Sequence, residues 1–185
     1  MSRLFLVRHS APLIDPSVPP GEWPLSPEGE EASRQLAQRF HTLPASVCSS
    51  PEAKAVQTAR LLTQGWGVQV EVEAGLREVE GRAWANSPTE YERAVSRYLR
   101  GEVVEGWEER GNAQKRIVAV VEEAMGAQED LLIVSHGLVL VLLLSWLLEM
   151  KPGMLFRVWQ GMRFPDLCAL DWKTREVVRP FGEPV

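Results

Sequence analysis

The sequence predicts a three-layer α/β/α sandwich with a mostly parallel central sheet. Two short and strongly apolar segments, Arg3–Val7 and Leu131–Val134, have the composition of strands that are buried on both faces. Segments with helical periodicity separate the predicted strands, and this alternation is typical of parallel sheets. The length of 185 residues suits a single domain over residues 1–185 with a substantial core.

The first half of the chain contains two predicted helices with clear start signals. After strand 3–7 and a proline-rich loop, Ser26-Pro27 places a capping serine before a proline at the first helical position. Its apolar residues recur at helical spacing and predict one buried face: Ala32, Leu36, Phe40 and Leu43. A short strand at 45–48 precedes Ser50-Pro51, which we interpret as the cap of a second helix that runs to about residue 63.

The second half is interpreted on the same grounds. Ser87-Pro88-Thr89-Glu90 is a capping box that begins a polar helix ending near Arg100. Pro152-Gly153 is interpreted as the stop of an apolar helix over 138–150. The other predicted elements are a strand at 68–72, a helix at 113–125, a strand at 131–134 and a strand pair at 168–172 and 176–179.

Composition excludes several classes of function. The 25 acidic residues outnumber the 20 basic ones, giving a net charge of −5 without a basic block, so we expect no nucleic-acid or membrane partner. Cys48 and Cys168 are too few for a disulfide framework, and we expect both to be reduced in a cytoplasmic protein. The apolar run 131–148 resembles a membrane span in length, but Ser135-His136-Gly137 divides it into a strand and a helix.

Two of the three histidines occupy equivalent positions at the ends of predicted buried strands. His9 follows the strand 3–7, and His136 follows the strand 131–134. Ligands of open α/β sheets bind beyond the carboxyl ends of the strands, beside helix N-termini whose N–H groups suit a phosphate. If the two strands are neighbours, the imidazoles face each other there. A lone histidine is more often structural, but the repeated placement favours a functional role.

Four sequence blocks, in this order, resemble the signature motifs of the histidine phosphatase superfamily, the phosphoglycerate mutase-like enzymes. They are Leu6-Val7-Arg8-His9, the segment Ser50–Ala59, Leu76-Arg77-Glu78 and Val134-Ser135-His136-Gly137. The resemblance implies a phosphoglycerate mutase-like fold with a small helical segment at about 81–111 that covers the substrate. It also implies a reaction without a metal or other cofactor.

The resemblance assigns a chemical role to each motif residue. His9 would be the nucleophile that forms a phosphohistidine, and Arg8 would bind two phosphoryl oxygens through its planar guanidinium. His136 would stabilise charge on the transferred group, and Glu78 would protonate the leaving alkoxide and then activate water. The remaining phosphate-binding residues would be Ser10, Lys54 and Gly137.

The chain departs from the family pattern at two of these positions. Ser10 replaces the usual glycine, which is a mild change. Lys54 replaces the second arginine of the phosphate clamp and loses its two-pronged geometry, although the chain otherwise prefers arginine, 16 to 4. Either another arginine, such as Arg60 or Arg82, fills the gap, or phosphate binding is weaker.

The assignment of the general acid leaves rivals open. Glu80 is the obvious alternative to Glu78, and Asp15 and Glu22 in the proline-rich loop are more distant ones. Trp23 and Trp84 lie in loops near the motifs and are candidates for the substrate entrance, whereas a helix-terminal location favours a structural role for His41.

These observations predict a metal-independent phosphomonoester hydrolase that acts on a small phosphorylated metabolite. Phosphoglycerate mutase-type transfer is the nearest alternative, although the family's mutases are usually longer chains. A catalytically impaired phospho-ligand binding protein is the alternative from another class. Small enzymes of this type often dimerise, so a homodimer is a further expectation, and the identity of the substrate stays open.

Overall fold

Six strands form one sheet in the computed structural model, which describes residues 2–40, 44–81, 87–126 and 130–183. The strands are β1 (Arg3–Arg8), β2 (Ser46–Ser49), β3 (Val70–Val72), β4 (Leu131–Ser135), β5 (Asp166–Asp171) and β6 (Val177–Arg179). Their order across the sheet is β3-β2-β4-β1-β5-β6, and β3, β2, β4 and β1 run parallel while β5 and β6 are antiparallel to their neighbours. The predicted mostly parallel sheet is confirmed.

The two histidine-bearing strands are direct neighbours. β1 and β4 pair in parallel from Leu4 opposite Leu131 to Arg8 opposite Ser135. The pairing continues for one residue, because the N–H group of His9 donates to the carbonyl of Ser135 at 2.9 Å. Both strands therefore end at the same edge of the sheet.

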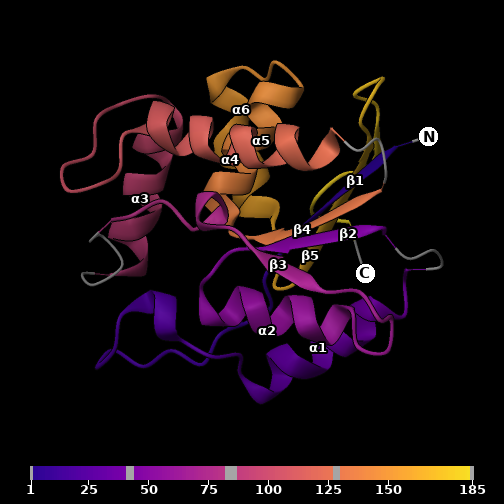
Figure 1. Cartoon of the computed structure of the whole chain (residues 1–185). Coiled ribbons are helices and arrows are strands. Elements are labelled where there is room, and N and C mark those ends of the chain that lie inside the picture. The colour runs from indigo at the N-terminus through magenta and orange to yellow at the C-terminus, as the bar shows by residue number, and fades with distance from the viewer. Residues whose placement is uncertain (1, 41–43, 82–86, 127–129, 184–185) are drawn as a thin grey trace.

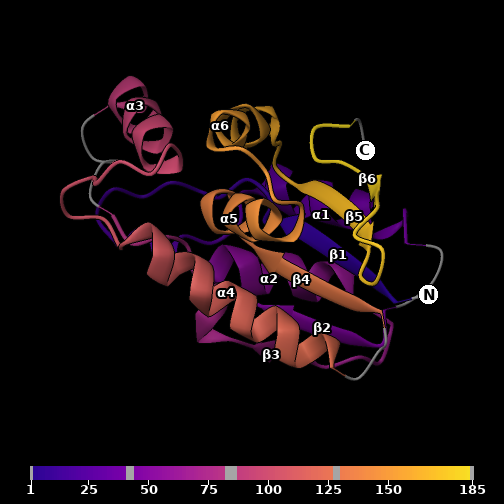
Figure 2. The same ribbon diagram turned by 90° about the horizontal axis from the view of Figure 1, so that it is seen from above.

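Helices cover both faces of the sheet, as predicted. They are α1 (Pro27–Ala37), α2 (Ala53–Leu62), α3 (Pro88–Leu99), α4 (Arg110–Met125), α5 (Gly137–Leu147) and α6 (Pro152–Gly161), with short 3-10 turns η1 (Pro20–Glu22) and η2 (Ala74–Leu76). Helices α1 and α2 lie on one face, and α4, α5 and α6 lie on the other (Figure 1). Helix α3 lies beyond the carboxyl ends of β1 and β4 (Figure 2).

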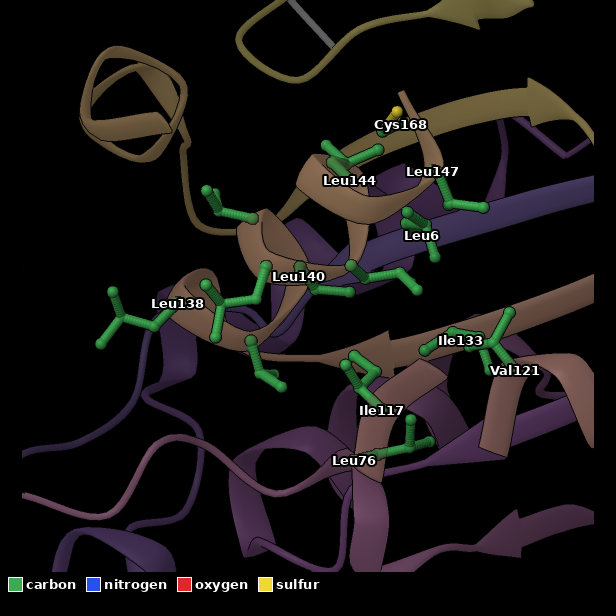
Figure 3. Close-up of a cluster of buried hydrophobic side chains, with 14 of the residues drawn as sticks. Leu6, Leu76, Ile117, Val121, Ile133, Leu138, Leu140, Leu144, Leu147 and Cys168 are labelled. Carbon is green, nitrogen blue, oxygen red and sulfur yellow. The ribbon is translucent and has the colours of Figure 1, made fainter. Parts of the chain in front are cut away.

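The alternation of side chains along β1 divides the core into two clusters. Leu4 and Leu6 point to the face covered by α4 and α5, whereas Phe5 and Val7 point to α1 and α2. Figure 3 shows part of the larger cluster, in which leucines of α5 lie over Leu6 of β1 and beside side chains of the neighbouring helix α4. Helix α5 is buried on nearly all sides, which explains its uninterrupted apolar sequence. In the described part of the chain, no helix is both long and apolar enough to span a membrane.

Two predicted helix starts prove wrong. Helix α2 begins at Ala53 with Glu52 as its N-cap, not at Pro51 after a Ser50 cap. The hydroxyl of Ser50 lies 2.7 Å from Nε2 of His136 and accepts only a longer hydrogen bond, of 3.3 Å, from the N–H of Glu52, so a long-range partner competes with the local cap. Helix α4 begins at Arg110, three residues earlier than its apolar periodicity indicates.

Helix α6 is absent from the sequence-based prediction. Pro152-Gly153 was expected only to end the preceding helix, but Pro152 is also the first residue of α6. Proline suits this position because the first N–H group of a helix has no intrahelical partner.

The predicted capped starts of α1 at Ser26 and of α3 at Ser87 are confirmed, since each serine accepts a hydrogen bond from the backbone N–H three residues later.

Helix α1 approaches the loop after His9 closely enough to require a glycine. A Cβ atom at Gly29 would lie 2.2 Å from the carbonyl oxygen of Ala11, which also accepts a hydrogen bond from Ser26. Real Cβ atoms do not approach backbone atoms this closely, so Gly29 sets the spacing between α1 and the loop.

We therefore expect Gly29→Ala to lower the free energy of unfolding by about 1–3 kcal/mol, the usual effect of overpacking. The matched control is Gly153→Ala in the first turn of α6, where an added Cβ meets no atom within 4 Å. There the greater helix propensity of alanine should leave stability unchanged or raise it by up to about 1 kcal/mol. Urea denaturation followed by circular dichroism measures both, and equal effects would contradict the steric explanation.

Candidate active site

His9 is a buried and uncharged imidazole at the carboxyl end of β1. Its Nδ1 lies 2.8 Å from the carbonyl oxygen of Ser10, which can only accept, so Nδ1 carries the proton and Nε2 keeps its lone pair. Burial, reinforced by the neighbouring His136, holds the pKa of His9 well below its ordinary value. The tautomer and the charge state are those of a nitrogen nucleophile.

His136 lies beside it at the N-cap of α5. The two ring centroids are 5.0 Å apart. Nε2 of His136 contacts the hydroxyl of Ser50, whereas its Nδ1 is buried and has no hydrogen-bond partner among the described residues. Burial, together with the charges of Lys54 and Arg8, lowers the pKa of His136 well below its ordinary value. A bound phosphoryl dianion would reverse this balance and favour the imidazolium.

Arg8 supplies a partly buried guanidinium at the end of β1, and its charge acts on both imidazoles. It donates to the carbonyl oxygen of Met162 at 3.1 Å, and the ring of Phe164 covers it at 3.5 Å from its centroid. Burial lowers the pKa of Arg8 to about 10, which still leaves the group charged at neutral pH. Its Nε is buried without a partner among the described residues, so the guanidinium keeps a donor for a ligand.

Gly137, the first residue of α5, allows a close approach. A Cβ atom here would lie 3.1 Å from Nε1 of Trp159 and 3.4 Å from Cζ of Arg8. The absent side chain therefore lets the guanidinium and the indole pack against the start of α5.

Glu78 is held at the N-terminus of the same helix. Its carboxylate accepts hydrogen bonds from the backbone N–H groups of Val79, Leu138 and Val139 at 3.0, 3.2 and 3.1 Å. Burial nevertheless raises the pKa of Glu78, and the nearby carboxylate of Glu52 adds to the effect. A carboxyl group that retains its proton at higher pH than usual suits general acid catalysis.

Arg116 of α4 braces the loop that carries Glu78, and sequence reasoning missed it. Its guanidinium donates to the carbonyl oxygens of Gly75, Arg77 and Glu78 at 2.7, 2.6 and 3.0 Å. It also forms two hydrogen bonds with Glu108, at 2.9 and 2.8 Å. No local signal distinguishes this arginine from an exposed one on a polar helix, because its partners lie far away in sequence.

Lys54 is buried, but its ammonium is already engaged. Nζ donates to the carbonyl oxygen of Pro20 at 2.7 Å and to Oε2 of Glu52 at 2.5 Å. Oε1 of Glu52 accepts from the backbone N–H of Glu78 at 2.8 Å and lies 3.3 Å from Nε2 of His136. Sequence analysis overlooked Glu52, although its position two residues before Lys54 within a motif was a usable signal.

Ser10 is committed to packing in this structure. Its hydroxyl lies 2.6 Å from that of Ser33 in α1, and its N–H donates to the hydroxyl of Thr58 in α2 at 3.0 Å. The hydroxyl and the N–H group of Ser10 therefore tie the loop behind His9 to the two helices. This placement favours a structural role for Ser10.

The rival acids and clamp arginine lie elsewhere. The side chain of Glu80 is 71% exposed and pairs with Arg77. The residues Asp15, Glu22 and Arg60 are also exposed. Trp23 is buried, and its indole N–H donates to the carbonyl oxygens of Asp15 and Val18, so it closes the proline-rich loop on itself. Arg82, Trp84 and His41 fall outside the described residues.

Aromatic side chains from α3, α6 and the loop between α3 and α4 form a cluster, of which Tyr91 interacts electrostatically with Glu78. The ring of Tyr91 in α3 lies 6.0 Å from that of Trp107 and 6.1 Å from that of Trp159. Burial, and then the charge of Glu78, raises the pKa of the Tyr91 hydroxyl above its ordinary value, while Arg8 opposes the shift. Helix α3, within the segment expected to cover the substrate, therefore approaches the site. Among the described residues, no cluster of three or more His, Cys, Asp or Glu side chains could hold a metal ion.

Comparisons with known proteins show the family and the fold of the chain. The model of the histidine phosphatase superfamily (branch 1) matches residues 4–177. Bacillus stearothermophilus YhfR superposes with a TM-score of 0.78 at 20% identity, over 100% of this chain and 98% of that one. A phosphoserine phosphatase from Entamoeba histolytica gives 0.77 at 20% identity, over 99% and 98%. The alpha-ribazole phosphatase from Shigella flexneri gives 0.72 at 21% identity, over 98% and 96%. A search of curated protein sequences finds no match.

The lowered pKa values lead to a prediction about the two imidazoles. An ordinary histidine titrates near 6.5, so His9 and His136 should both remain neutral at about pH 6. As the pH falls through 6.5, the unfolded chain takes up protons first, and the free energy of unfolding should decrease. Long-range 1H–15N spectra of the imidazole nitrogens show whether each ring is charged or neutral and which tautomer it adopts. His9 should show the Nδ1–H tautomer. A midpoint at or above 6.5 for His9 would contradict the structure.

Proposed function

The chain belongs to the histidine phosphatase superfamily, branch 1, and from this membership we propose that it hydrolyses small phosphomonoesters through a phosphohistidine at His9. The observation that carries the proposal is the neutral imidazole of His9, whose Nε2 keeps its lone pair, together with the buried Nδ1 of His136 and Nε of Arg8, which have no hydrogen-bond partner in the part of the chain that the structure describes. The two imidazole centroids are 5.0 Å apart, and the charge of Arg8 acts on both rings, so the three side chains lie close enough together to bind one phosphoryl group.

The first step transfers the phosphoryl group to the enzyme. Arg8 and protonated His136 hold the phosphoryl oxygens while Nε2 of His9 attacks phosphorus and forms a P–N bond. The ester P–O bond breaks, and its electron pair goes to the leaving oxygen, which takes the proton of Glu78. The alcohol departs and leaves phosphohistidine together with an ionised Glu78.

The second step returns the enzyme to its starting state. Ionised Glu78 removes a proton from water, whose oxygen attacks phosphorus while the P–N bond breaks. His9 recovers its lone pair, Glu78 recovers its proton and inorganic phosphate leaves. The mechanism routes no step through a metal, because cationic side chains supply the positive charge around the phosphoryl group.

We also propose a small phosphorylated metabolite as the substrate and a reducing, cytoplasmic location. Structural neighbours that are phosphatases for phosphoserine and alpha-ribazole phosphate support the first part. Tyr91 and Trp107, from the segment 81–111, give that segment an aromatic surface suited to covering such a ligand. Both cysteines are buried and unpaired, which supports the second part.

Removal of the nucleophile should abolish turnover. His9→Ala is expected to reduce hydrolysis of p-nitrophenyl phosphate by at least about 10³-fold, as for other enzymes that lose a nucleophile. His41→Ala, at the third histidine, serves as the control and should retain activity. Wild-type protein that is quenched during turnover of 32P-labelled substrate should carry an acid-labile phosphoryl group, and His9→Ala should carry none.

The alternatives give different results in the same assays. Wild-type protein that binds phosphate but turns over no ester at any pH would be a binding protein. Isomerisation of 3-phosphoglycerate with bisphosphoglycerate, faster than phosphate release, would indicate a mutase.

The proposed role of Glu78 as the general acid predicts a loss of activity that depends on the leaving group of the substrate. Glu78→Gln cannot donate a carboxylic proton, so hydrolysis of an alkyl phosphate should slow by about 10²–10⁴-fold, the usual contribution of a general acid. The effect on p-nitrophenyl phosphate should be smaller, because p-nitrophenolate leaves readily without a proton. Glu80→Gln is the matched control on the same loop. If both substrates slow equally in Glu78→Gln, then Glu78 is not the acid.

A further inference from the structure

Glu52 connects three groups of the proposed catalytic site. One carboxylate oxygen contacts the ammonium of Lys54 at 2.5 Å, and the other contacts the backbone N–H of Glu78 at 2.8 Å and Nε2 of His136 at 3.3 Å. The side chain of Glu52 is only 16% exposed, and that of Lys54 is 7% exposed. An ion pair at this depth is screened weakly by solvent and salt.

Two of the three N–H donors of Lys54 are engaged within the protein. An ammonium group has three N–H donors, and two of them are directed at Glu52 and the carbonyl oxygen of Pro20. Only one donor is left for a phosphate oxygen. The carboxylate also places a negative charge close to the imidazole of His136, where a phosphoryl dianion would bind, and like charges repel one another at short range.

We propose that Glu52 acts as an internal counter-ion that competes with phosphate for Lys54 and thereby keeps the affinity for the inorganic phosphate product low. This inference rests on the proposed function, because it concerns the same phosphate site. Glu52 is a positioning residue in this reaction, since it acts through Lys54 and Glu78. Weak retention of phosphate favours release of the product at the end of each turnover.

Glu52 also affects the general acid. The charged and titratable groups that act electrostatically with Glu78 are Arg8 and Glu52, together with the tyrosines Tyr91 and Tyr98. Of these, Glu52 has the like charge that raises the pKa of Glu78. Its removal should therefore move the alkaline limb of the pH profile of kcat to lower pH.

Calorimetric titration with inorganic phosphate tests the proposal. Glu52→Gln removes the charge, and its amide nitrogen cannot accept a hydrogen bond from Lys54. We expect it to bind phosphate on the order of tenfold more tightly, with a parallel rise in product inhibition. The control is Glu80→Gln, which removes the same charge from an exposed site and should leave phosphate affinity within about twofold of the wild type.

A second comparison distinguishes two causes of tighter phosphate binding in Glu52→Gln. One is the release of the Lys54 ammonium from its ion pair, and the other is the loss of repulsion between the Glu52 carboxylate and phosphate. In a Lys54→Met background no ammonium can be freed, so Glu52→Gln should give much less than its tenfold gain. An equal gain in both backgrounds, or phosphate affinity in Glu52→Gln that is unchanged or weaker, overturns the proposal. A merely structural role for Glu52 predicts weaker binding and no movement of the pH limb.

A fallback variant and the choice of calorimetry ensure that the experiment gives an answer in every case. If Glu52→Gln does not fold, Glu52→Asp keeps the charge but shortens the reach toward Lys54, and phosphate affinity no higher than that of the wild type counts against the proposal. Calorimetry requires no turnover. Wild-type protein that binds phosphate without hydrolysing esters would therefore refute the proposed function, while the effect of Glu52 would still be measured.

Discussion

The parallel pairing of β1 with β4 is the interaction on which the candidate site depends. The two strands are in register up to Arg8 opposite Ser135, and one more hydrogen bond extends from His9 to the carbonyl of Ser135. This register places the two imidazoles with their centroids 5.0 Å apart. A slip by one residue would turn one of them to the opposite face of the sheet. The apolar side chains that alternate along both strands resist such a slip, because each face has its own core cluster.

The start of α5 is the second organising feature. His136 is its N-cap, Gly137 is its first residue, and its first turn holds the carboxylate of Glu78. The partial positive charge of a helix N-terminus therefore faces the acid directly. The burial of α5 on nearly all sides fixes this start rigidly, so the position of the acid derives from the packing of the core.

Sequence reasoning predicted those parts of the structure that local patterns encode. The sheet, the capped helices at Ser26 and Ser87, and the juxtaposition of His9 with His136 followed from apolar runs and capping signals. The partners of buried polar groups did not follow. Ser50 looked like a helix cap because nothing local indicated that His136 would engage its hydroxyl. Glu52 and Arg116 escaped attention because their roles arise from contacts across the fold.

The brace formed by Arg116 makes two parts of the protein interdependent. Glu108 lies between α3 and α4, and its carboxylate holds the guanidinium that in turn holds the carbonyl oxygens around Glu78. The segment that is expected to cover a substrate is thus linked through Arg116 to the proposed proton donor, Glu78. A sequence change between α3 and α4 that removes Glu108 would leave the guanidinium of Arg116 without its acidic partner, so in this protein the segment cannot vary independently of the loop that carries Glu78.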